Sequence, residues 1–144
     1  MPLQDRWFGQ ANGKTAGRMH RFFTLIRSHS VAMSLITLLA ITVLSLRPLS
    51  QLPEAPGGDK AHHVVAYAVL MFPAALRYPA GCVGFGLFFI AYGGAMELIQ
   101  PMVNRYGTWP DFFANVAGVL LGVLLGALVN RLILGSRPET TRPG

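Results

Sequence analysis

Hydrophobic residues in this chain gather into four runs that are separated by short polar, proline- or glycine-containing segments. A helix needs roughly 20 mostly apolar residues to cross the hydrocarbon core of a bilayer. The pattern therefore predicts an all-α protein, an integral membrane four-helix bundle. The expected membrane-spanning helices cover about residues 29–46, 60–77, 80–100 and 111–134.

The remaining sequence is too short for a soluble domain. We expect residues 1–28 to form a basic cytoplasmic arm, residues 29–134 the four-helix domain, and residues 135–144 a cytoplasmic tail. No small-residue cleavage site follows the first apolar run, so an uncleaved anchor is favoured over a signal peptide. The segment from Thr108 to Asp111 has the pattern of a helix-capping box and predicts the start of the fourth helix.

Composition and charge support a location in the inner membrane of a cell. Charged residues make up 12% of the chain, against about a quarter in ordinary soluble domains. A net charge of +6 would suggest nucleic acid in a soluble protein, but no basic stretch interleaved with aromatic residues accompanies it. With both termini in the cytoplasm, the positive-inside rule accounts for the charge. The basic residues then on the cytoplasmic side are Arg6, Lys14, Arg18, Arg21, Arg27, Arg77, Arg131, Arg137 and Arg142.

Polar residues recur at helical spacing beside the helix ends that this topology places outside the cell. Residues three or four apart share a helix face, and an ionisable side chain inside a membrane should face the bundle rather than lipid. We therefore expect one outward-facing polar pocket. Its candidate ligand-binding residues are Asp59, Lys60, His63, Tyr67, Glu97, Gln100, Arg105, Asp111 and Asn115.

Some of these residues also have a simpler interpretation. Asp59 and Asp111 suit helix caps, and a long basic side chain such as Lys60 can reach the lipid headgroups. Three other candidates lie deeper in the membrane than capping requires, and they favour a functional pocket over a purely structural hydrogen-bond network. They are His63, Glu97 and Asn115.

The ordered set of polar residues, from Asp59 to Asn115 and on to Gly118, resembles the VanZ-like membrane proteins. The resemblance covers about residues 35–128. It implies that the candidate ligand-binding residues, all except Tyr67, are signature positions of the family. The founding member of that family is associated with low-level resistance to the glycopeptide teicoplanin, which acts on cell-wall precursors. The resemblance therefore implies a bacterial cell-envelope protein with a link to antibiotic resistance, and it supplies no general biochemical activity that could be carried over to this chain.

Three functions remain open from the sequence. The favoured one is binding of a membrane lipid or lipid-linked envelope precursor by its headgroup. The second is an enzyme that acts on such a headgroup, with His63 and Glu97 as acid and base, although no Ser or Cys lies at these helix ends. The third is a structural bundle or a small carrier. No cofactor is expected, and no HExxH spacing supports a metal site.

Three glycines at every fourth position, Gly118, Gly122 and Gly126, predict close helix packing. We expect this surface to join the third and fourth helices, with a homodimer as the alternative. The single cysteine, Cys82, excludes an internal disulfide.

Overall fold

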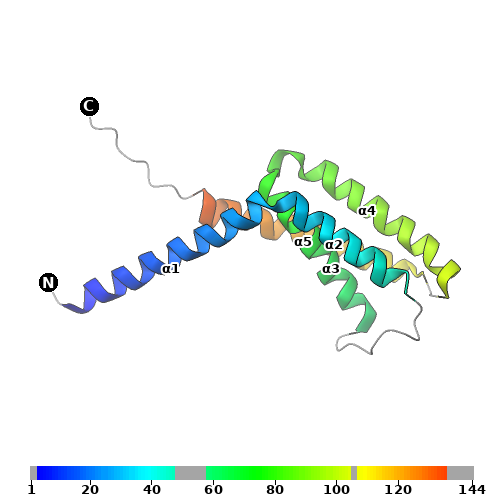
Figure 1. The fold of residues 1–144 in the computed structure, drawn as a ribbon, viewed down its shortest axis with the longest axis horizontal. Helices are drawn as coiled ribbons and strands as arrows, with labels where there is room; N and C mark the ends of the chain where they lie inside the picture. Colours follow the sequence, from blue (N-terminus) through cyan, green and yellow to red (C-terminus); the bar gives the residue numbers. More distant parts are fainter. Residues whose placement is uncertain (1–2, 48–57, 105–106, 136–144) are drawn as a thin grey trace.

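The computed structural model describes residues 3–47, 58–104 and 107–135, and within them the side chains of residues 15–47, 60–104 and 107–135. In these segments the chain forms helices and turns and no strand, which confirms the all-α prediction. The α-helices are α1 (Leu3–Ser28), α2 (Ser30–Ser45), α3 (Gly58–Arg77), α4 (Cys82–Ile99) and α5 (Trp109–Val129) (Figure 1). Short 3-10 turns flank α4, namely η2 (Pro79–Gly81) and η3 (Gln100–Val103), and a π-helical turn, η4 (Asn130–Leu134), continues α5.

Two helical stretches are long and apolar enough to cross a membrane, which indicates a membrane protein. They are Pro79–Val103, with 25 residues, and Trp109–Leu134, with 26. These stretches coincide with the third and fourth predicted spans. A third candidate arises if α1 from Thr15 and α2 form one span, but the two are bent by 69°. At 16 residues, α2 alone is about 24 Å long and shorter than the ~30 Å hydrocarbon core.

The basic arm is helical, which the sequence analysis did not anticipate. Helix α1 projects away from the cluster formed by the other helices (Figure 1). Its last turns nevertheless contact α3, because the ring of Phe23 lies 6.3 Å from that of Phe72. The guanidinium of Arg77, at the end of α3, also donates a hydrogen bond to the carbonyl of Arg27 at 3.1 Å.

Helix α3 forms the centre of the fold, packed mainly against α5 and α2 and to a lesser extent against α4. Its side chains Leu70, Met71 and Leu76 are fully buried. The sequence predicts a span at 60–77, but α3 is not among the helices that are long and apolar enough. Its central position explains how it can be less apolar than α4 and α5, because His63 and Tyr67 of α3 face neighbouring helices.

The three glycines of α5 lie against α3, so the expected pairing with α4 is wrong. A Cβ on Gly118 would lie 2.4 Å from the carbonyl oxygen of Val64. A Cβ on Gly122 or Gly126 would lie 2.7 or 2.8 Å from atoms of α3. Only glycine permits this approach of the two backbones. The glycine surface is thus buried inside the chain, as expected for intramolecular packing.

The fold separates two chemically different ends. At the first, which we call the basic end, Arg27 and Arg77 meet. The amide of Asn130 donates to the carbonyl of Leu76 at 3.1 Å and so fixes the end of α5 at the same place. The opposite end contains the first turns of α3 and α5 and the last turn of α4.

Candidate functional site

Three polar side chains from three helices meet at the end opposite the basic end. His63 comes from α3, Glu97 from α4 and Asn115 from α5. The imidazole Nδ1 of His63 lies 2.9 Å from Asn115 Oδ1, and Asn115 Nδ2 donates to Glu97 Oε1 at 3.4 Å. His63 Nδ1 is 3.9 Å from the same carboxylate oxygen. The structure therefore brings together the three candidate residues that were expected from the sequence to lie deeper in the membrane than helix caps.

The direction of these hydrogen bonds identifies the protonated nitrogen of the imidazole. Asn115 uses its NH2 group to donate to Glu97, so its carbonyl oxygen faces His63 and can only accept. His63 must therefore donate from Nδ1, and Nε2 is the basic nitrogen of the neutral ring. Asn115 is 1% exposed and Glu97 is 9% exposed, so little water competes with this chain of hydrogen bonds.

The second oxygen of the Glu97 carboxylate is bound by the loop before α5. The backbone N–H of Thr108 donates to Glu97 Oε2 at 3.1 Å. Thr108 is also the N-cap of α5, because its hydroxyl accepts from the N–H of Asp111 and donates to the Asp111 carboxylate. This confirms the predicted cap. One loop residue thus joins the start of α5 to the site.

Gly107 permits this loop to approach α4, a role that the sequence analysis missed. A Cβ on Gly107 would lie 1.9 Å from the backbone oxygen of Glu97, which no side chain can tolerate. The only signal in the sequence was a glycine directly before the capping threonine, Thr108.

Tyr67 extends the site toward the middle of the bundle. Its side chain is 2% exposed, and its buried hydroxyl has no hydrogen-bond partner among the described residues. The absence of a side chain at Gly93 makes room for it, because a Cβ there would lie 3.0 Å from Tyr67 Oη and 3.1 Å from Asn115 Nδ2. Buried hydroxyls in folded proteins normally have a partner. The phenol therefore offers a donor to a bound molecule or water.

The structure describes some of the other predicted site residues in full, and others in part or not at all. Gln100 and Asp111 are buried, with 2% and 5% exposure, just after the end of α4 and in the first turn of α5. Lys60 is exposed in the first turn of α3. The side chain of Asp59 and the whole of Arg105 lie outside the described residues.

The cluster offers hydrogen-bond donors and acceptors from three helices. The hydroxyl of Thr108 is engaged with Asp111 on both its donor and acceptor sides. Within the described segments, no three His, Cys, Asp or Glu residues are grouped closely enough to hold a metal ion. Lys60 is exposed three residues before His63 on the same helix.

These features define an all-helical protein with two or three candidate membrane spans and a buried polar site at one end. No family model matches the chain, and comparisons with curated proteins and with solved structures give no match either. The resemblance to VanZ-like proteins therefore stays a hypothesis that depends on the ordered residues alone.

Proposed function

We propose that this protein is a multi-pass protein of the bacterial inner membrane that binds the headgroup of a cell-envelope lipid or lipid-linked precursor. The binding site is the polar cluster around His63, Glu97 and Asn115. In this proposal the basic end faces the cytoplasm, as the positive-inside rule favours, and the cluster faces the cell exterior. Given its resemblance to VanZ-like proteins, we also propose a contribution to glycopeptide tolerance.

One observation carries the proposal, namely the buried hydroxyl of Tyr67 without a partner beside a chain of satisfied polar groups. In a purely structural network we expect every buried polar group to be paired, since an unpaired one costs about 1–3 kcal/mol. The hydroxyl lies against Gly93 close to Asn115 Nδ2. A ligand hydroxyl or carbonyl at this point would restore the missing hydrogen bond.

The chemistry of the cluster favours a headgroup that combines phosphate and hydroxyl groups. The exposed ammonium of Lys60 suits phosphate. The buried carboxylates of Glu97 and Asp111 accept hydrogen bonds, which sugar hydroxyls can donate. A zwitterionic lipid without hydroxyl groups would use fewer of these contacts.

The test is mass spectrometry of lipids that co-purify with the protein in a gentle detergent. We expect wild type to retain a phosphate- and sugar-bearing lipid, and Tyr67→Phe and Glu97→Gln to lose it. Tyr92→Phe is the matched control, because the Tyr92 hydroxyl already has a partner, Thr42 at 2.5 Å. The control should lower thermal stability and keep the lipid. Equal lipid content in wild type, Tyr67→Phe and Glu97→Gln would overturn the proposal.

An enzyme is the second candidate, and the orientation of His63 favours it. An imidazole that donates from Nδ1 presents Nε2 as a general base. Here His63→Ala should abolish turnover of the retained lipid while the lipid still binds. Wild-type protein that retains its lipid unchanged over prolonged incubation would exclude turnover and leave binding.

A further inference from the structure

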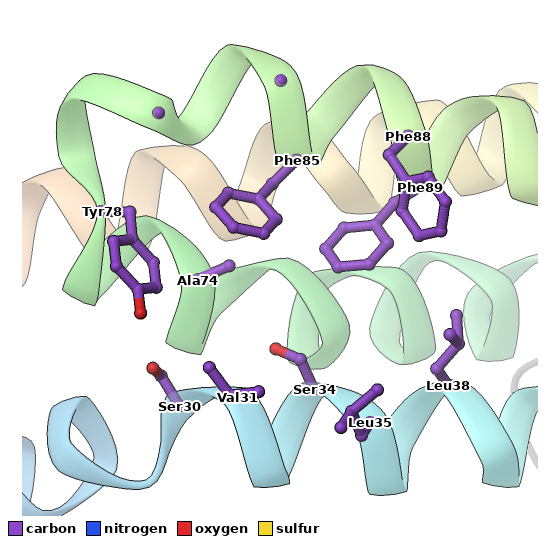
Figure 2. A pocket seen from close by; sticks show the side chains of 12 residues that line it. Ser30, Val31, Ser34, Leu35, Leu38, Ala74, Tyr78, Phe85, Phe88 and Phe89 are labelled. Atoms are coloured by element: carbon purple, nitrogen blue, oxygen red, sulfur yellow. The ribbon is translucent and has the colours of Figure 1, made fainter.

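A cavity lies toward the basic end, away from the polar site. It is a groove of about 490 Å³ between α2 and α4, with Ala74 of α3 at its floor. Figure 2 shows Ser30, Val31 and Ser34 of α2 on one side and Phe85 and Phe89 of α4 on the other. The volume is within the range of sites that hold small ligands.

The groove exists because α2 and α4 both pack on α3 and hardly contact each other. Toward the polar-site end the gap is closed by the hydrogen bond between Thr42 and Tyr92. Its outer rim is apolar, since Leu35 of α2 and Phe88 of α4 line the groove and are 61% and 57% exposed. In a membrane these side chains face hydrocarbon, so the groove opens sideways to the acyl chains of lipids.

Polar groups mark the basic end of the groove; further along α2, Ser34 also lines it, but its hydroxyl donates to the carbonyl of Leu70. The hydroxyl of Ser30 lines it, is 1% exposed, and has no hydrogen-bond partner among the described residues. Beside it, the Nε of Arg77 donates to the hydroxyl of Tyr78 at 2.9 Å, and the guanidinium lies 5.3 Å from the centre of that ring. The same guanidinium contacts the carbonyl of Arg27. The basic end of the groove thus carries a positive charge and hydrogen-bonding groups, whereas most of its wall is apolar.

We infer that the groove holds an acyl chain of an anionic phospholipid from the leaflet at the basic end. The apolar wall takes the chain, the hydroxyl of Ser30 donates to an ester carbonyl, and Arg77 attracts the phosphate. Charge complementarity selects an anionic lipid, as for basic pockets between membrane helices. The inference is independent of the proposed function, because the two sites lie at opposite ends of the bundle.

The chain offers a matched pair of variants for the test. Gly84 lines the groove, and a Cβ there would have no atom within 4 Å. Gly84→Phe therefore places a large side chain at the wall of the groove, starting from a Cβ that meets no other atom, and phenylalanine is a better helix former than glycine. Gly17→Phe in α1 is the control, because a Cβ at Gly17 also has no atom within 4 Å but lies outside the groove. Ser30→Ala removes only the unpartnered hydroxyl.

The assay is native mass spectrometry of the full chain with phosphatidylglycerol or phosphatidylcholine of identical acyl chains. We expect wild type and Gly17→Phe to retain phosphatidylglycerol over phosphatidylcholine. Gly84→Phe should lower the retention of phosphatidylglycerol about tenfold or more, since a few methylene groups are expelled. Ser30→Ala should lower it about fivefold, as expected for one hydrogen bond.

Three results would overturn the inference. They are equal retention of the two lipids by wild type, equal retention by Gly84→Phe and Gly17→Phe, and a wild-type dimer that Gly84→Phe dissociates. The last would assign the groove to a second copy of the chain. If Gly84→Phe fails to fold, Ser30→Ala decides alone, because unchanged retention in that variant contradicts the assigned hydrogen bond.

Discussion

Gly118→Ala perturbs the contact on which the whole arrangement depends, the approach of α5 to α3. The new Cβ would lie 2.4 Å from the carbonyl oxygen of Val64 and 2.8 Å from Tyr67 Cβ, whereas ordinary contact begins near 3.4 Å. The two helices would have to separate by about 1 Å, and overpacking of this kind costs ~1–3 kcal/mol. Replacing glycine by alanine inside a helix gains up to about 1 kcal/mol at the same time.

Gly84→Ala is the control that isolates the packing cost. It changes helix propensity by the same amount, but its Cβ would meet no atom within 4 Å. Reversible unfolding in mixed micelles should therefore show Gly118→Ala about 1–3 kcal/mol less stable than Gly84→Ala. Equal free energies of unfolding would refute the described α3–α5 contact. Loss of a dimer with unchanged unfolding of the monomer would instead place the glycines between two chains.

Three further predictions concern the site and the topology. Thr108→Ala removes the cap of α5 and should lower the free energy of unfolding by about 1 kcal/mol, while Thr108→Ser, which keeps the hydroxyl, should restore it. Gly107→Ala should lose the lipid that co-purifies with wild type, because its Cβ would clash with the backbone of Glu97; normal lipid content would contradict the loop position. In intact cells an impermeant thiol reagent should label Cys82 only after permeabilisation, whereas Asn104→Cys in a chain without that cysteine should react directly. The opposite pattern would invert the orientation.

Periodicity and turn chemistry were sufficient to predict most helix boundaries. The prediction of 60–77 differs by two residues from α3, and 111–134 corresponds to α5 with η4. The cap at Thr108 was predictable because it depends on residues next to each other in the sequence. Helical spacing also predicted that Glu97 would face the bundle, because its alternative was an ionised carboxylate in hydrocarbon.

The pairing of helices was not predictable from the same information. The glycine surface of α5 indicated a close partner, but the sequence does not say which helix provides it. The helical arm was missed because its polar residues and glycines gave no clear apolar face. The hydroxyls of Tyr67 and Ser30 are unpaired because the neighbouring helices place no hydrogen-bond partner beside them. This depends on the packing of helices, so it could not be predicted from the sequence.

The most direct test of the account is photo-crosslinking at the rim of the polar site. Benzoylphenylalanine at Lys60, which is exposed three residues before His63, should form an adduct with a phosphate- and sugar-bearing envelope lipid in intact cells. The same substitution at the exposed Arg47, after the end of α2, is the control and should capture bulk lipids only. Identical adducts at both positions, or no lipid adduct at residue 60, would contradict a headgroup site at these helix ends.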